Sequence, residues 1–375
     1  MDTKDKDFEL ASPGIMTPDS TMQPLLIEND TLNGSATQTV GADEEIIAVP
    51  GQKPKKSNTP FQESMRRLRR DKRAMVSLGI IILFILIPIF GPVIYQHIGG
   101  TYNSSFFGPI GPSLYHNPFH QELDRQDELF SAQYWLGTDG IGRDLFARLM
   151  QGMLVSIMVA LLVEIVDVVM GVTIGVLAGF YGGWIDQLLA RFTDIMFAFP
   201  GLLFAILLTG IFGTTADTAF ANIPLIGANG NARLILVSLA LAFTAWPLMA
   251  RYVRGQTLQL KEQQFVEAAR TSGTSDYKII MRHIIPNLSS IVVVAATLDI
   301  SGTIIGEAGL SLLGLGVQAP GSSIGLMISD ASSGGNLQVH PWEVLLPSIV
   351  LTILVLAFSF LGDGLRDAFD PRSKD

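Results

Sequence analysis

The sequence of 375 residues contains no cysteine and few charged side chains. The absence of cysteine excludes disulfide bonds, thiolate metal ligands and cysteine nucleophiles. Only 16% of the residues are Asp, Glu, Lys or Arg, whereas soluble domains contain about a quarter. Hydrophobic residues reach 48% and glycines number 37, a combination that membrane bundles tolerate because small residues let helix backbones approach closely. The composition therefore favours helices packed in lipid.

Sequence motifs for nucleotide and zinc chemistry are also missing. No G-x-x-x-x-G-K-[ST] loop occurs, so the chain lacks the usual phosphate cradle of ATP-hydrolysing proteins. The five histidines show no H-E-x-x-H spacing, which argues against catalytic zinc. We therefore predict that the chain is not an enzyme and has no cofactor and no metal of its own. An intramembrane enzyme with a serine nucleophile is disfavoured, although scattered serines alone do not exclude it.

Charge is unevenly distributed along the chain. Residues 1–58 are rich in Thr, Ser, Asp, Gly and Pro without sustained periodicity, which predicts a disordered tail. The first 50 residues are mostly acidic, and a basic block follows from Lys53 to Arg73. Because an apolar run comes directly after this block, a membrane flank is favoured over a nucleic-acid partner.

Six apolar runs are each close to the length of about 20 residues that a helix needs to cross a bilayer. They lie near residues 74–98, 153–181, 188–212, 234–252, 288–313 and 344–361. Because hydrocarbon offers no water to backbone amides, such runs must be helical. The sequence therefore predicts an all-α membrane protein with six transmembrane helices.

The distribution of lysine and arginine predicts the orientation of these helices. Basic residues gather in the tail and in the loops on the same side, so the positive-inside rule places both termini in the cytoplasm. The predicted organisation is a cytoplasmic tail (1–58), a basic flank with the first helix (59–98), an extracytoplasmic segment (99–151), a five-helix core (152–363) and a cytoplasmic C-terminal tail (364–375). The lipid bilayer is the first expected partner.

Acidic residues inside the predicted helices are functional candidates, because a charge at the bilayer centre costs about 3 kcal/mol or more. Glu164 and Asp167 fall in the second predicted helix, Asp194 in the third, and Asp299 and Glu307 in the fifth. They could line a polar solute path, or they could form hydrogen bonds within the bundle or lie near the membrane interface. We favour the second interpretation, since no lysine or arginine is expected at a comparable depth to pair with them.

A polar stretch between the fourth and fifth predicted helices is the most informative segment. Residues 264–273 have helical composition, Gly273 suits a left-handed helix end, and residues 276–284 are again amphipathic. We predict two short helices joined at the glycine, within a loop of residues 256–285. Small Ala268 and Ala269 would let another protein pack closely, with Glu267 at the edge of the contact. The alternative is a loop that rests on lipid headgroups.

This stretch resembles the EAA loop of binding-protein-dependent ABC importer permeases in Glu267-Ala268-Ala269, in Gly273 and in Pro286. His283 stands where the general pattern has an apolar residue, and a histidine there resembles the peptide and nickel branch. Two further segments resemble the same branch: Leu136-Gly137-Thr138-Asp139-Gly140-Ile141-Gly142-Arg143-Asp144, and Leu361-Gly362-Asp363-Gly364-Leu365-Arg366-Asp367 with Asp370-Pro371-Arg372. The resemblance covers residues 60–372 and is closest to the second permease, or C-type subunit, of oligopeptide and dipeptide importers.

The resemblance implies a type I ABC importer transmembrane domain in the cell membrane, importing short peptides. Its expected partners are a second homologous permease, two ABC ATPases that bind ATP and Mg²⁺, and an extracytoplasmic solute-binding protein, with no nucleic acid. Glu267, Ala268, Ala269 and Gly273 would form the contact with an ATPase. A nickel or other small-solute importer is the alternative within this family, and an ion-coupled secondary transporter is the alternative outside it.

Asp139 and Arg143, in the predicted extracytoplasmic segment, have two possible roles. They could contact the solute-binding protein, or they could pair with each other across four residues of a helix turn. We favour the pairing.

Overall fold

The computed structural model describes residues 60–99, 116–219, 222, 233–333 and 338–369, which belong to one compact unit within Ser57–Asp375. The predicted tail of residues 1–58, the first part of the extracytoplasmic segment and the Asp370-Pro371-Arg372 motif lie outside the described residues.

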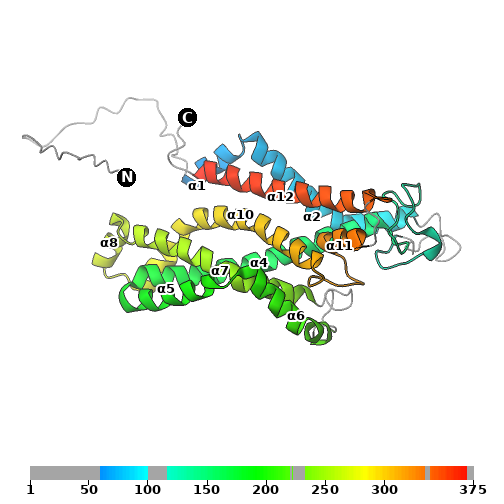
Figure 1. Cartoon of the computed structure of the whole chain (residues 1–375). Coiled ribbons are helices and arrows are strands. Elements are labelled where there is room, and N and C mark those ends of the chain that lie inside the picture. Colours follow the sequence, from blue (N-terminus) through cyan, green and yellow to red (C-terminus); the bar gives the residue numbers. More distant parts are fainter. Residues whose placement is uncertain (1–59, 100–115, 220–221, 223–232, 334–337, 370–375) are drawn as a thin grey trace, which may run out of the picture. The chain divides into compact units, whose positions relative to one another are not determined.

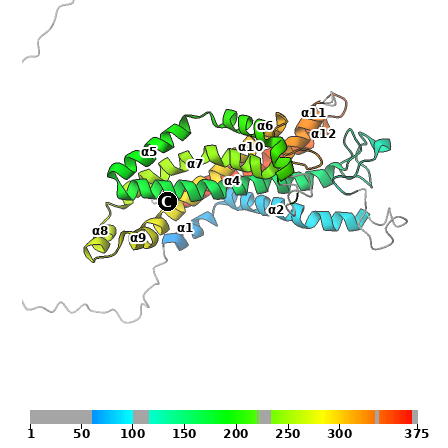
Figure 2. The ribbon, with the colours of Figure 1, turned by 90° about the horizontal axis from the view of Figure 1, so that it is seen from below.

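The described part of the chain is helical and has no β-strand, apart from an isolated antiparallel bridge between Thr138 and Asp144. Its elements are α1 (Pro60–Leu68), α2 (Lys72–Gly99), the short 3₁₀ helix η2 (Leu123–Arg125), α4 (Leu145–Tyr181), α5 (Gly183–Ala198), α6 (Gly201–Ala219), α7 (Arg233–Leu260), α8 (Gln264–Thr271), α9 (Asp276–Ile279), the π-helical turn η3 (Ile280–Ile284), α10 (Ile285–Leu312), α11 (Ile324–Ser333) and α12 (Trp342–Phe369). Figure 1 labels the longer helices, and Figure 2 also labels α9.

Six stretches of the described chain are long and apolar enough to cross a membrane: Lys72–Tyr95, Leu145–Tyr181, Gly201–Ala219, Arg233–Leu260, Asp276–Leu312 and Trp342–Phe369. Large apolar side chains remain exposed along them, among them Val76, Ile165, Leu203 and Ile349, as expected where lipid replaces water. The predicted all-α fold with six membrane helices is confirmed.

The third predicted helix is not continuous, so that prediction was wrong. α5 ends at Ala198 and α6 begins at Gly201, with Phe199 in an extended conformation before Pro200. Proline disfavours a helical conformation in the residue before it and has no N–H to donate, which explains the break. Of these two helices, only α6 is long and apolar enough to cross a membrane, whereas α5 has 16 residues.

Other helices run past the apolar stretches that predicted them. α4 begins at Leu145 because Asp144 caps it, its carboxylate accepting from the backbone N–H groups of Phe146 and Ala147. α7 continues to Leu260, and the fifth span starts at Asp276 rather than near residue 288. An apolar run indicates only the part of a helix that is suited to lipid, so the helix can extend beyond the run at either end.

The closest packing in the bundle is between α4 and α7, which run side by side in Figures 1 and 2. Gly171, Gly175 and Gly179 form a stripe on α4, and a Cβ atom added at any of them would lie 2.6 to 2.7 Å from the nearest atom of α7. We call these three residues the glycine stripe. Small residues four apart let two membrane helices come into backbone contact. Around this pair, α10 packs on α12 and α4, α2 packs on α12, and α6 packs on α7.

We expect Gly175→Ala to destabilise the protein by about 1–3 kcal/mol, the usual effect of overpacking. The new Cβ would lie 2.6 Å from the backbone oxygen of Ala250 and 2.8 Å from Cβ of Val253. The thermal unfolding midpoint of the detergent-solubilised protein measures the effect. Gly255→Ala on α7 is the matched control, because nothing lies within 4 Å of its Cβ position. Equal midpoints for the two variants would contradict the close α4–α7 contact.

Candidate functional site

The predicted helix–glycine–helix element is present at one end of the bundle. α8 ends in a Schellman motif, in which the N–H of Gly273 donates to the oxygen of Arg270 (2.9 Å) and the N–H of Thr274 to that of Ala269 (3.1 Å). Gly273 has a φ of 74°, a left-handed conformation that glycine adopts without steric cost. The second helix is not separate, because α9 continues through η3 into α10.

α8 and the turn before it are fixed to the ends of the long helices by one buried side chain and two polar contacts. Val266 is fully buried in an apolar cluster with Phe180 of α4 and with side chains of α7 and α9. The guanidinium of Arg270 lies 5.2 Å from the centre of the Phe180 ring. Just after the end of α7, Nζ of Lys261 donates to the backbone oxygen of Gly179 over 3.0 Å. The position of α8 therefore depends on the α4–α7 pair.

The outer side of this element exposes apolar and small side chains. Phe265 is 40% exposed, Tyr277 68% and Met281 47%. Glu267 and Ala268 are exposed as well, whereas Ala269 is partly buried against the cluster around Val266. We call the set Phe265, Glu267, Ala268, Tyr277 and Met281 the α8 surface. Exposed apolar side chains gathered in one short segment are typical of a contact with another protein or with the membrane.

The five acids predicted inside the helices separate into three environments. Glu164, Asp167 and Asp299 come together, and one carboxylate oxygen of each lies within 4.8 Å of one oxygen of both others. Glu307 is fully buried elsewhere, where its carboxylate accepts hydrogen bonds from the hydroxyls of Ser156 and Ser311, both at 2.8 Å. It joins α10 to α4 by hydrogen bonds, as the second interpretation of the acids expected. Asp194 behaves differently.

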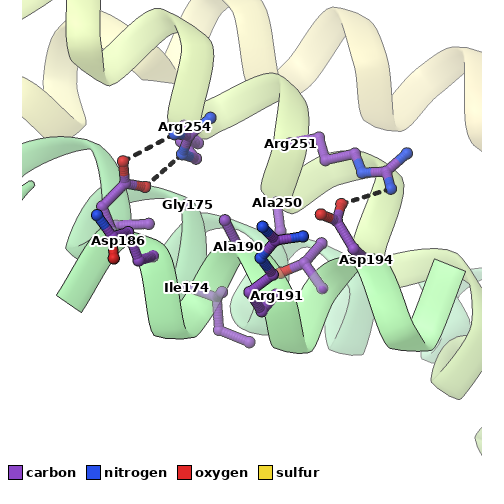
Figure 3. A pocket seen from close by; sticks show the side chains of 12 residues that line it. Ile174, Gly175, Asp186, Ala190, Arg191, Asp194, Ala250, Arg251 and Arg254 are labelled. Carbon is purple, nitrogen blue, oxygen red and sulfur yellow. Dashed lines mark hydrogen bonds and ion pairs between the residues drawn. The ribbon is translucent and has the colours of Figure 1, made fainter. Parts of the chain in front are cut away.

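Asp194 lies on α5, exposed, and pairs with Arg251 of α7 at 2.7 Å. The expectation that no basic residue would match the depth of the acids was therefore wrong for this position. A second pair joins the same two helices, where Asp186 binds Arg254 with an Oδ2–Nη2 distance of 2.7 Å (Figure 3). The hydrogen bond from Arg254 lowers the pKa of Asp186. These pairs border a cavity of about 580 Å³ between α5, α4 and α7.

At the other end of the bundle, Asp139 accepts three hydrogen bonds from two arginines. Its carboxylate binds Nε of Arg143 at 2.7 Å, the backbone N–H of Arg143 at 2.9 Å and Nη1 of Arg148 at 2.6 Å. Both arginines also reach Asp330 of α11. The predicted Asp139–Arg143 pair is confirmed, but it closes a turn before α4 and is not part of a helix.

The sequence did not predict that Arg148 and Asp330 belong to this network. Arg148 is 1% exposed and lies in the first turns of α4, where a lone basic residue at the start of an apolar run was the available signal. Burial alone would raise the pKa of Asp139, but attraction to Arg148 and Arg143 outweighs it, and the pKa falls below its ordinary value of 3.8. We call Asp139, Arg143, Arg148 and Asp330 the arginine network.

A second unpredicted contact adjoins the arginine network. Nδ1 of buried His116 lies 2.8 Å from Asp144, the residue that caps α4, and the His116 ring packs against Tyr95 of α2 with centroids 3.9 Å apart. The segment before α4 is thereby held against α2.

Comparison with known proteins gives two family matches. The family described as binding-protein-dependent transport system inner membrane component matches residues 171–375, which is more than half of the chain. The family described as the N-terminal TM domain of oligopeptide transport permease C matches residues 59–127.

Individual relatives agree with these families. The glutathione transport system permease protein GsiD of Escherichia coli O157:H7 is 37% identical over 329 residues, which covers 88% of this chain and 96% of the relative. The GsiD proteins of Shigella boydii serotype 4 (strain Sb227) and Shigella sonnei (strain Ss046) give the same values.

We expect Asp139→Asn to destabilise the protein by about 3 kcal/mol, because two buried guanidinium groups lose the more buried of the two carboxylates that they share. Thermal unfolding of the detergent-solubilised protein measures the loss. Asp330→Asn is the matched control, since the Asp330 side chain is 39% exposed, and it should cost about 1 kcal/mol or less.

The same variant makes the effect of pH visible. A carboxyl group with a lowered pKa stabilises the fold above its ordinary value of 3.8 and stops doing so as the pH falls toward the folded value. The difference in stability between the wild type and Asp139→Asn should therefore be constant near neutral pH and shrink below about pH 4. A difference that grows on acidification would contradict the assignment.

Proposed function

The chain belongs to the family of binding-protein-dependent transport inner membrane components, as a permease of the peptide branch of ABC importers, and we propose that it imports short peptides through coupling at the α8 surface. Permeases of this family span the inner membrane beside a partner permease and work with an ATPase and a binding protein. Because the ATPase hydrolyses ATP, the permease itself is not an enzyme.

The α8 surface is the observation that carries the coupling proposal. It combines exposed apolar side chains with small Ala268, so an ATPase subunit can approach the helix closely. Glu267, at its edge, supplies a charge for an ion pair with the ATPase. Ala269 is only partly buried, so it can take part in this contact while it packs against the cluster around Val266 and helps to hold α8 in place. Gly273 provides the left-handed turn that sets the angle between α8 and α9.

The contacts behind α8 supply a route for mechanical coupling. Val266 and Arg270 pack on Phe180 at the end of α4, and Lys261 donates a hydrogen bond to the backbone oxygen of Gly179. α9 continues without a break into α10, which crosses the bundle and binds α4 through Glu307 and Ser156. A displacement of α8 on ATP binding would therefore move α10 and the α4–α7 pair together. This movement would alternate access to the solute path.

The orientation follows from the position of α8. An ATPase that uses cytoplasmic ATP must meet α8 in the cytoplasm, which agrees with the basic residues Arg254, Lys261, Arg270, Lys278 and Arg282 around it. Both chain termini then lie in the cytoplasm, and the arginine network lies on the outer side.

Transport measurements test the substrate class. The name of GsiD refers to glutathione, a tripeptide, and supports a short peptide as the solute. With the partner subunits in proteoliposomes, we expect ATP-dependent accumulation of radiolabelled dipeptides or tripeptides. A non-hydrolysable ATP analogue is the control. Accumulation of Ni²⁺ without any peptide would contradict the peptide assignment and favour the metal-transporting alternative.

We expect Ala268→Trp to reduce peptide uptake at least tenfold, because an indole on the outer side of α8 would keep the ATPase surface away. The amount of permease in the membrane should not change, since Ala268 is exposed within this chain. Lys72→Trp places the same side chain on an exposed residue of α2 and should leave uptake intact. Co-purification with the ATPase measures docking directly. Normal uptake by Ala268→Trp would refute the role of α8.

A further inference from the structure

Three acidic side chains meet inside the bundle, where no part of the transport cycle proposed above requires them. Glu164 and Asp167 are three residues apart on α4, which places them on the same face of the helix. Asp299 comes from α10, which packs against this face. One carboxylate oxygen from each of the three residues lies within 4.8 Å of the other two. We call the three residues the acid triad.

The acid triad lacks the partners that buried carboxylates normally have. Glu164 is 7% exposed and Asp167 2%, yet both oxygens of Glu164 and Oδ1 of Asp167 have no hydrogen-bond partner among the residues that the structure describes. Within the described part of the chain, no Lys, Arg or His forms an ion pair with any of the three. Burying a carboxylate without a partner is strongly unfavourable. A bound positive charge would remove this cost.

Glu307 shows that the bundle satisfies an acid when the acid is only structural. It lies two turns further along α10 and is fully buried, with two serine hydroxyls donating to its carboxylate. The acid triad has received no such donors, although α4 and α10 form both environments. The contrast indicates that the triad oxygens are kept available.

A cavity reaches two of the three acids of the triad. It measures about 490 Å³, and Asp167 and Asp299 lie in its wall. The remaining lining is mostly apolar, including Leu248, Tyr252 and Leu298, with Arg366 of α12 also in the wall. Leu248 and Tyr252 are 59% and 45% exposed, so the cavity borders a surface that this chain does not cover by itself.

We propose that the acid triad is a binding site for a cation, either a free divalent metal ion or the ammonium group of a transported solute. Carboxylate oxygens are the ligands that hard cations such as Mg²⁺, Ca²⁺ and Mn²⁺ prefer. An ammonium group has three N–H donors, which match three carboxylates. The ammonium source rests on the proposed peptide import, whereas the metal source does not. In either case the cation neutralises like charges that the low dielectric would otherwise force apart.

The metal source is tested with Mn²⁺ alone, on the assembled transporter in lipid nanodiscs. Paramagnetic resonance counts the ions bound to the wild type and to the isosteric variants Asp167→Asn, Asp299→Asn and Glu164→Gln. We expect the variants to lose one Mn²⁺ per permease or to bind it at least tenfold more weakly. Glu307→Gln, a buried acid outside the triad, is the matched control and should bind as the wild type does.

The ammonium source is tested by uptake into proteoliposomes of a dipeptide and of its N-acetylated form, with the same binding protein throughout. We expect the uptake rate of the free dipeptide, divided by that of the N-acetylated form, to fall at least fivefold in Asp167→Asn and Asp299→Asn relative to the wild type. Because the comparison is a ratio, a general loss of transport does not imitate it. ATPase activity and co-purification of the partner subunits report on folding.

The two experiments distinguish the two sources of the cation. Loss of Mn²⁺ binding alone assigns a metal ion, and loss of the ammonium preference alone assigns the solute. If Mn²⁺ binding and the uptake ratio are both unchanged in variants that assemble, the proposal is refuted. If no peptide is taken up even by the wild type, the proposed function fails, and the Mn²⁺ measurement still decides the cation site.

Arg366→Gln removes the competing guanidinium in the cavity wall and should not weaken Mn²⁺ binding. Weaker binding would contradict a competition between Arg366 and the bound cation for these carboxylates.

Discussion

The close contact between α4 and α7 is the constraint on which the rest of the molecule depends. In lipid, apolar surface gives little reason for two helices to associate, so close packing and hydrogen bonds must hold them. The glycine stripe lets α7 approach the backbone of α4 at Gly171, Gly175 and Gly179. The last of these glycines also accepts the hydrogen bond from Lys261, beyond which the chain turns into α8. The same few residues therefore hold the bundle together and position the α8 surface.

Charged groups inside the bundle are handled in three ways, and the differences follow from local partners. The arginine network compensates two buried guanidinium groups with carboxylates from a turn and from α11. Glu307 is satisfied by serine hydroxyls. The acid triad has neither kind of partner among the described residues. Burial of a charge is unfavourable unless a partner compensates it, so a bound cation would stabilise the acid triad more than the other two groups.

The sequence predicted those features that local chemistry determines. Apolar length predicted the six membrane helices, and Gly273 predicted the left-handed turn after α8. The division between α5 and α6 was missed although Pro200 signals it, because the apolar run continues across the proline. The arginine network was only half predicted, since Asp139 and Arg143 are neighbours whereas Asp330 lies 182 residues beyond Arg148. Nor does any local pattern show that Asp299 meets Glu164 and Asp167. Such contacts depend on how α10 and α11 pack against α4.

The π-helical turn at Ile280–Ile284 has a consequence for how the two ends of the fifth span relate. Here the N–H of Ile285 donates to the oxygen of Ile280, one residue further back than in an α-helix. Each added residue shifts the phase of a helix by about 100°. The π-helical turn thus changes the rotation of α9 relative to α10 about the helix axis. The side of α9 that faces Val266 and the side of α10 that faces α4 are therefore not tied to each other by α-helical geometry, although α9, η3 and α10 are continuous. A change in the packing of α9 can therefore be accommodated at the π-helical turn without a change in how α10 packs against α4.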